Sequence, residues 1–159
     1  MFHTERYDGA REEQYDLVIR QLQALLEGEP DRIANLSNAS ALLNQFLDRI
    51  NWVGFYLYRD GELVLGPFQG LPACVRIQLN RGVCGKAASE RQTVLVPNVH
   101  EFPGHIACDA ASQSEIVVPI VKNGELLGVL DIDSPELERF DETDRAGLER
   151  FVEELLRHL

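Results

Sequence analysis

Two dipeptides that favour tight reverse turns divide the middle of this chain into hairpins. Asp60-Gly61 separates the apolar runs WVGFYLYR and GELVLGPF, and Asn123-Gly124 separates EIVVPIV from ELLGVLDID. Such turns are strong signals of a two-residue β-hairpin, because both central residues must adopt a positive φ that Asn, Asp and Gly tolerate. Strands joined by a hairpin run antiparallel, so the sequence predicts an antiparallel sheet.

Helical periodicity flanks these strands on both sides. Residues 12–27 carry apolar side chains at helical spacing, Asp31 can cap a second helix that runs to about Arg49, and Asp141 can open the last one. Shorter strands are expected at 75–79 and 93–99, with a short helix between them. We therefore expect an α+β fold with a central antiparallel sheet of about six strands and the N- and C-terminal helices packed on one of its faces.

The chain should form one domain over residues 1–159. The N-terminal helices are expected at about 11–49, the sheet and the active-site loops at about 51–134, and the C-terminal helix at about 141–159. No internal repeat or linker divides the sequence.

Composition argues against several classes of partner. Fifteen Lys and Arg residues against 26 Asp and Glu give a formal charge of −11, without the basic stripe that a phosphate backbone requires. The same acidity disfavours anionic membranes, and no apolar run approaches the roughly 18–20 residues of a membrane span. The first residues lack a signal-peptide core, so we expect a cytoplasmic protein whose thiols are kept reduced.

The three cysteines, Cys74, Cys84 and Cys108, fit neither a C-x-x-C pair nor a complete set of internal disulfides. Each is therefore either core filler or a reactive thiol. His105 lies three residues before Cys108 and could accept a thiol proton. Zinc held by the three cysteines and His105 is chemically possible, although no pair of ligands has the short spacing of a standard zinc site.

Four carboxylates lie near the cysteines or on one late strand: Asp109, Glu115, Asp131 and Asp133. Asp131 and Asp133 should project from the same face, because side chains alternate along a strand. They either end a strand in solvent or form a receptacle for an ammonium group or a metal ion. Trp52, the only tryptophan, is either a core residue or the wall of an apolar pocket.

Several segments in consecutive order resemble a known family. The segments are NWVGFYL, LGPFQG, AC, GVCG, GHIACDAAS, SEIVVPI and GVLDIDS, which extend from about Asn51 to Phe140 and so cover over half of the chain. Together with the cysteine spacing they resemble the free methionine-R-sulfoxide reductases, which are single GAF domains. The first fifty residues match this family only loosely.

The resemblance implies a separate role for each cysteine. Cys108, in GHIACD, matches the nucleophile that attacks the sulfoxide sulfur, releases methionine and becomes a sulfenic acid. Cys74 matches the resolving cysteine that condenses with this sulfenic acid to form a disulfide. Cys84 matches an auxiliary cysteine that lines the pocket.

The resemblance also implies a substrate site. Glu115, Asp131 and Asp133 match the acids that hold the substrate's amino group, and Trp52 matches the aromatic wall around its methyl-sulfur end. A carboxylic acid kept protonated by its neighbours could supply the proton for the departing oxygen, and we favour Glu115 for this role. Leu71 departs from the family, whose members often carry lysine there.

Partners follow from the same resemblance. Neither a cofactor nor a metal is expected to be bound. Thioredoxin, reduced indirectly by NADPH, would restore the thiols, and the chain could form a homodimer. Such an enzyme would act in defence against oxidative stress.

The alternative function is that of a GAF-type sensor, which binds a small ligand without catalysing a reaction.

Overall fold

The computed structural model describes residue 7, residues 9–105 and residues 109–159. Cys108 lies outside these described residues. The elements follow the predicted order, with one short 3-10 helix added before the fifth strand. They are α1 (Arg11–Leu26), α2 (Arg32–Phe46), β1 (Trp52–Arg59), β2 (Glu62–Gly70), β3 (Arg76–Gln78), α3 (Gly82–Glu90), β4 (Val94–Val96), η1 (Val99–Glu101), β5 (Ser114–Lys122), β6 (Glu125–Ser134) and α4 (Glu142–Leu156).

The strands form one six-stranded sheet in the order β3-β2-β1-β6-β5-β4, and neighbouring strands are antiparallel. The two predicted hairpins are β1–β2 and β5–β6, and they join side by side through the β1–β6 pairing. Asp60, Gly61, Asn123 and Gly124 all have positive φ, as two-residue hairpin turns require. Both hairpin predictions are confirmed.

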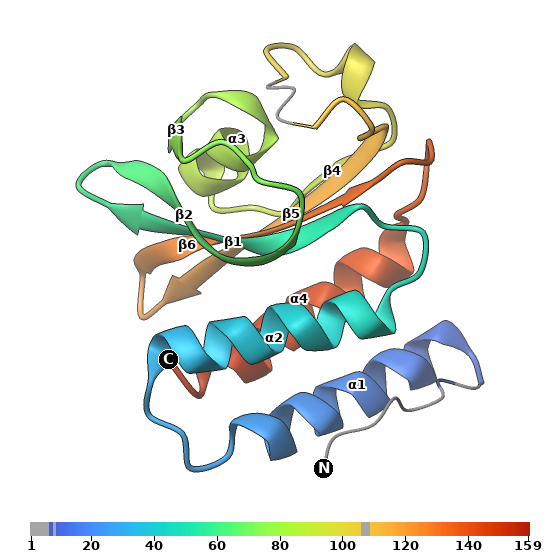
Figure 1. The fold of residues 1–159 in the computed structure, drawn as a ribbon, viewed down its shortest axis with the longest axis vertical. Coiled ribbons are helices and arrows are strands. Elements are labelled where there is room, and N and C mark those ends of the chain that lie inside the picture. Colours follow the sequence, from blue (N-terminus) through green and yellow to red (C-terminus); the bar gives the residue numbers. More distant parts are fainter. Residues whose placement is uncertain (1–6, 8, 106–108) are drawn as a thin grey trace.

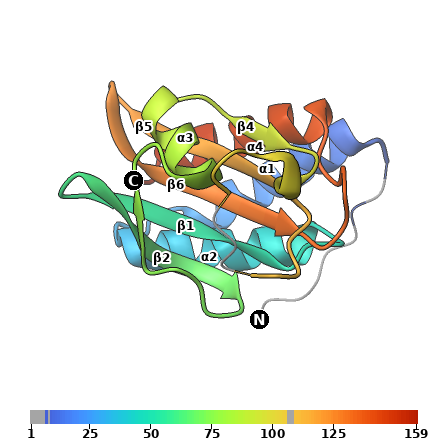
Figure 2. The same cartoon turned by 90° about the horizontal axis from the view of Figure 1, so that it is seen from above.

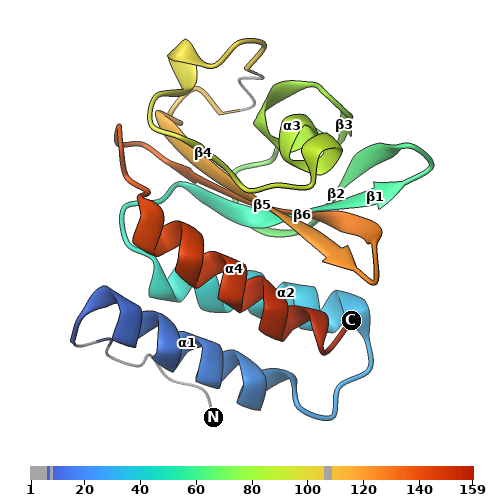
Figure 3. The ribbon, with the colours of Figure 1, turned by 180° about the vertical axis from the view of Figure 1, so that it is seen from behind.

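Three long helices cover one face of the sheet and α3 lies on the other. Figures 1 and 3 show α2 and α4 directly beneath the strands, with α1 beneath them. Figure 2 shows α3 on the opposite side, where it packs against β5 and β6. The predicted α+β architecture is therefore confirmed. Within the described part of the chain, no helix is long and apolar enough to cross a membrane.

The alternation of side chains along β1, β5 and β6 produces two separate apolar clusters. Val53, Phe55, Ile116 and Leu130 belong to the larger cluster, which packs against the three long helices. Trp52, Tyr56, Val117 and Val129 project from the opposite face and pack with residues of α3. A strand period of two thus gives the sheet a structural face and a second face that is available for a site.

The predicted helix starts are confirmed, and two helix ends differ. The last helix was expected to reach about residue 159 but ends at Leu156. The Asp31 side chain accepts a hydrogen bond from the Ala34 amide, and Asp141 forms a capping box with Asp144. The second helix was expected to reach about Arg49 but ends at Phe46. Arg49 has a positive φ, and its carbonyl accepts a hydrogen bond from Ser134 on β6. The chain therefore leaves the helix early because this contact directs it into β1.

Gly147 on α4 should tolerate no larger residue. A Cβ atom there would lie 2.3 Å from the ring of Tyr15 on α1, which is 2% exposed and donates a hydrogen bond to Asp144. We expect Gly147→Ala to lower the free energy of unfolding by about 1–3 kcal/mol, because overpacking outweighs the helical preference for alanine. Urea denaturation measures the change. Glu153→Ala, an exposed site on the same helix, should stay within about 0.5 kcal/mol of the parent; equal stability of the two variants would contradict the expectation.

Candidate active site

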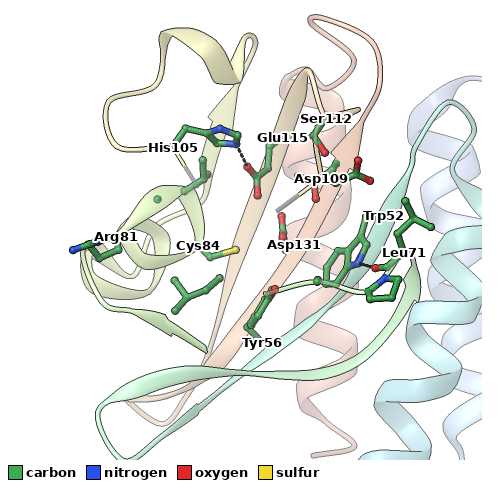
Figure 4. Close-up of a pocket in the computed structure, with 16 residues that line it drawn as sticks. Trp52, Tyr56, Leu71, Arg81, Cys84, His105, Asp109, Ser112, Glu115 and Asp131 are labelled. Carbon is green, nitrogen blue, oxygen red and sulfur yellow. Dashed lines mark hydrogen bonds and ion pairs between the residues drawn. The ribbon is translucent and has the colours of Figure 1, made fainter. Parts of the chain in front are cut away.

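The face of the sheet opposite the long helices brings the predicted acids together. Asp133 on β6 pairs with Trp52 on β1 and with Glu115 on β5, so the three residues form one row across the sheet. Asp131 lies two positions earlier on β6, where its β1 partner is Gly54. All three carboxyl groups line the same pocket, which Figure 4 shows in close-up.

Burial governs the charge of this acidic cluster. Glu115 and Asp131 are each 6% exposed, and Asp133 is half-buried. Burial, reinforced by the charges of Asp131 and Asp133, raises the pKa of Glu115 well above its usual range. Burial and the charge of Asp131 also raise the pKa of Asp133 well above its usual range. Burial also raises the pKa of Asp131, although hydrogen bonds from Glu115 and Cys84 oppose the rise. The cluster therefore either retains protons or requires a cation.

Aromatic side chains form the wall beside the acids. The Trp52 indole is 3% exposed and stacks between Tyr56 and Phe68, with ring centroids 5.9 and 5.2 Å away. Gly70, at the end of β2, approaches so closely that a Cβ atom would lie 2.5 Å from Trp52 Cδ1. The close packing of Trp52 thus requires glycine at position 70, the second glycine of GPFQG. Trp52 is both a buried core residue and part of the pocket lining.

Two hydrogen bonds tie the loop that carries Cys74 to this wall. Trp52 Nε1 donates to the carbonyl oxygen of Leu71 at 3.1 Å, and the Tyr56 hydroxyl donates to the carbonyl oxygen of Cys74 at 2.8 Å. Leu71 is 64% exposed and lines the pocket together with Pro72. Because both bonds involve the backbone, the hydrophobic side chain at position 71 does not alter them.

Tyr56→Phe should loosen this loop. The change removes the donor to the Cys74 carbonyl, a hydrogen bond whose loss costs about 1–1.5 kcal/mol. Amide hydrogen exchange at residues 71–76 should accelerate roughly tenfold as a result. Tyr58→Phe is the matched control, because Tyr58 is on the same strand but 38% exposed. Equal acceleration in the two variants would show that the Tyr56 hydroxyl does not hold the loop.

The described cysteines differ in environment. Cys84, in α3, is a free thiol that is 4% exposed, and burial followed by the charge of Asp131 raises its pKa well above the usual range. It is therefore a thiol and not a thiolate near neutral pH. Cys74 is half-buried and disulfide-bonded. Its predicted partner, Cys108, lies outside the described residues, so that pairing stays a prediction.

Residues on either side of position 108 anchor the loop to the site. Asn51 Nδ2 donates to Asp109 Oδ2 at 2.9 Å and to Ser112 Oγ at 3.1 Å. On the other side, His105 Nε2 lies 3.8 Å from Glu115 Oε1. Burial lowers the pKa of His105, so the ring is neutral near pH 7. Among the described residues, His105 thus contacts the acidic cluster.

The pocket unites most of the predicted site residues in a small space. Its cavity of about 40 Å³ has room for roughly three water molecules. Its lining comprises Trp52, Tyr56, Leu71, Pro72, Ala73, Ile77, Arg81, Gly82, Val83, Cys84, His105, Asp109, Ser112, Glu115, Asp131 and Asp133. Cys74 directly follows the loop segment in this lining. Sequence reasoning missed Tyr56, which the strand period starting from Trp52 could have indicated, and Asn51, for which no sequence signal existed.

Comparison with known proteins identifies the family of this chain. The GAF domain model matches residues 22–156. The free methionine-R-sulfoxide reductase of Escherichia coli (strain K12) is 54% identical over 86% of this chain and 82% of its own length. This chain belongs to the free methionine-R-sulfoxide reductase family of GAF domains. The resemblance in the sequence motifs is therefore confirmed.

Other relatives extend the match over nearly the whole chain. Protein YtsP of Bacillus subtilis (strain 168) is 57% identical over 98% of this chain and 96% of its own length. The X-ray structure of the Neisseria meningitidis free methionine-R-sulfoxide reductase, in complex with its substrate, has a TM-score of 0.94 and 42% identity. The similarity covers 99% of this chain and 95% of that one. The family's fold is thus shared from the first helix to the last.

Proposed function

We propose that this protein reduces free L-methionine-(R)-S-oxide to L-methionine. The observation that carries the proposal is the buried acidic cluster beside an aromatic wall, in a chain 54% identical to a free methionine-R-sulfoxide reductase. A free amino acid presents an ammonium group to the acids and an apolar methyl-sulfur end to the indole. This combination of charges and apolar surface matches the two halves of the pocket.

The acids account for selectivity toward the free amino acid. Asp131 Oδ1 is buried and has no hydrogen-bond partner in the described part of the chain, and a substrate ammonium would satisfy it. Methionine sulfoxide within a peptide has no such ammonium group and would leave Asp131 and its neighbours unpaired. A site with buried polar groups rejects an analogue that cannot satisfy them by large factors, on the order of 10⁴.

The reaction transfers the sulfoxide oxygen to a cysteine. In the proposed step, the Cys108 thiolate attacks the sulfoxide sulfur while Glu115 protonates the oxygen. A bond between the Cys108 sulfur and the substrate sulfur forms as the S–O bond breaks and the oxygen leaves as hydroxide or water. This hydroxide or water then attacks the Cys108 sulfur, which breaks the sulfur–sulfur bond, releases methionine and leaves Cys108 as a sulfenic acid. The substrate sulfur gains two electrons and the cysteine sulfur loses two. The raised pKa of Glu115 suits it to carry this proton near neutral pH.

Cys74 would then attack the sulfenic acid, releasing water and forming a disulfide with Cys108. The small cavity supports a loop movement between steps, because free methionine sulfoxide is larger than about three waters. Movement of the loop that carries Cys74 would break its hydrogen bonds to Trp52 and Tyr56. Thioredoxin would reduce the disulfide by thiol exchange, with Cys84 as an auxiliary thiol.

A stereospecific assay tests the proposal. Purified protein is incubated with dithiothreitol and with free R-sulfoxide, free S-sulfoxide or a peptide containing methionine sulfoxide, and released methionine is quantified. We expect turnover of the free R epimer alone. Equal turnover of the peptide would overturn the selectivity assigned to the acids. Consumption of NADPH with thioredoxin and its reductase tests the recycling partner separately.

The same assay separates the enzyme from a GAF-type sensor. A sensor would bind the sulfoxide and return it unchanged, so release of methionine excludes that alternative. The oligomeric state is a separate question, and sedimentation equilibrium would test the proposed homodimer.

A further inference from the structure

Three donor atoms from different elements converge at the floor of the pocket. Cys84 comes from α3, Glu115 from β5 and Asp131 from β6. Their ligand atoms, one sulfur and two carboxylate oxygens, all lie within 4.8 Å of one another, and all three residues are buried. Figure 4 shows the Cys84 sulfur and the Glu115 and Asp131 carboxyl groups directed toward the same space.

One of these donors, the buried carboxyl group of Asp131, would be stabilised by a positively charged partner. Asp131 is 6% exposed, and its Oδ1 accepts no hydrogen bond from the residues that the structure describes. A buried carboxylate oxygen without a partner costs free energy that a cation would recover. Within the described residues, the Glu115 carboxyl has only the neutral His105 ring as a basic neighbour, at 3.8 Å. Among residues 7, 9–105 and 109–159, no Lys or Arg side chain forms an ion pair with Cys84, Glu115 or Asp131.

We propose that Cys84, Glu115 and Asp131 form a binding site for a thiophilic divalent cation, with Zn²⁺ as the representative ion. One thiolate and two carboxylates are a zinc-like donor set, whereas Mg²⁺ and Ca²⁺ prefer six or more oxygens. Bonds of about 2.0–2.3 Å place tetrahedral ligands roughly 3.3–3.8 Å apart, so the donors need to contract only slightly. On binding, the Cys84 thiol and the protonated Glu115 carboxyl group each release a proton to solvent. The Cys84 sulfur and the carboxylate oxygens then bond to the ion, with no change in oxidation state.

The ion would act as an inhibitor and not as a cofactor. It would occupy the subsite where the acids face the substrate's ammonium group, in the pocket that Glu115, Asp131 and Asp133 line. The inhibitory consequence rests on the proposed reductase function, whereas the binding of the ion does not. The two can therefore be tested separately.

Direct binding is measured in protein whose Cys74 and Cys108 are both serine, because Cys84 is then the sole thiol. This protein is titrated with Co²⁺, a spectroscopic substitute for Zn²⁺, and the near-ultraviolet thiolate-to-cobalt charge-transfer band is recorded. We expect one equivalent to bind with this band, and Zn²⁺ to displace it. Adding Cys84→Ser should abolish the band, and adding Asp131→Asn should weaken binding at least tenfold. A missing band, or unchanged binding in Asp131→Asn, would overturn the site, provided circular dichroism shows that each variant is folded.

Inhibition is measured in a single turnover without dithiol, since dithiothreitol chelates zinc. Pre-reduced Cys74→Ser protein is mixed with free R-sulfoxide and increasing Zn²⁺, and methionine release is followed. We expect inhibition that excess sulfoxide relieves and that weakens at least tenfold when Cys84→Ser is added. Inhibition that is indifferent to Cys84 would assign the effect to other ligands and overturn the inhibitory role. Absence of methionine release without zinc would instead refute the reductase proposal and leave the Co²⁺ result standing.

Discussion

Cys108→Ser should reduce turnover of free methionine-R-sulfoxide by at least about 10³-fold. An alkoxide is a hard, strongly basic nucleophile that is scarcely populated near neutral pH, whereas a thiolate is soft and attacks sulfur readily. Methionine release in the presence of dithiothreitol measures the loss. Full activity in this variant would remove Cys108 from the mechanism.

The two other cysteines provide matched controls for this substitution. Cys74→Ser should slow multiple turnover yet still release about one equivalent of methionine per protein in a single turnover, because the attack on the sulfoxide precedes resolution. Cys84→Ser should retain measurable turnover, because the buried thiol has a raised pKa and is a poor nucleophile. A Cys74→Ser protein that releases no methionine would show that Cys74 acts before resolution.

Glu115→Gln should lower kcat by roughly 10²–10³-fold, the range expected for loss of a general acid. The amide is nearly isosteric but cannot donate an acidic proton, so the departing oxygen leaves as a poorer group. In the parent protein, kcat should fall as pH rises through the raised pKa of Glu115, because the acid form is then lost. The variant should lack this limb of the pH profile.

Asp133→Asn distinguishes a proton donor from a binding residue. If Asp133 serves the substrate's ammonium group, its substitution should raise KM more than it lowers kcat, the reverse of the pattern for Glu115→Gln. Glu125→Gln, an exposed site at the far end of β6, should leave both constants unchanged. A larger kcat loss in Asp133→Asn than in Glu115→Gln would reassign the proton donor.

The stability of the parent protein should also depend on pH through Glu115. A carboxyl group whose pKa is raised on folding favours the folded state at low pH, and this contribution is lost as pH rises from the ordinary carboxyl range through the raised pKa. The parent should therefore lose stability over this window. Glu115→Gln removes the buried charge and should lose less, which urea denaturation at two pH values would detect. A steeper loss in the variant would contradict this sign.

Local signals in the sequence predicted most of the fold. The turn residues at 60–61 and 123–124 need only their own backbone preferences, so their hairpins could be predicted without any distant contact. The caps at Asp31 and Asp141 are equally local. The end of α2 could not be predicted, because it depends on Arg49 meeting Ser134, which is distant in the sequence.

The candidate site, like the fold, could be predicted from the sequence only in part. The strand period could place Asp131 and Asp133 on one face, and motif resemblance could assign them a common task. The sequence could not show that Glu115 faces Asp133 in register across β5 and β6. Nor could it show that Tyr56 holds the backbone at Cys74, because that bond requires β1 and the loop after β2 to meet in space.

The sequence by itself therefore determined the elements, the antiparallel pairing, the family and the types of residue that the chemistry needs. Each of these depends on backbone preferences or on ordered motifs that lie within short stretches of chain. Only the tertiary structure decided how strongly the acids are buried and that the Cys84 thiol lies among them. It also decided that one Asp131 oxygen has no hydrogen-bond partner within residues 9–105 and 109–159. Burial and mutual repulsion depend on distances between separate strands, and these distances set the charges on which the proposed chemistry and the proposed cation site both depend.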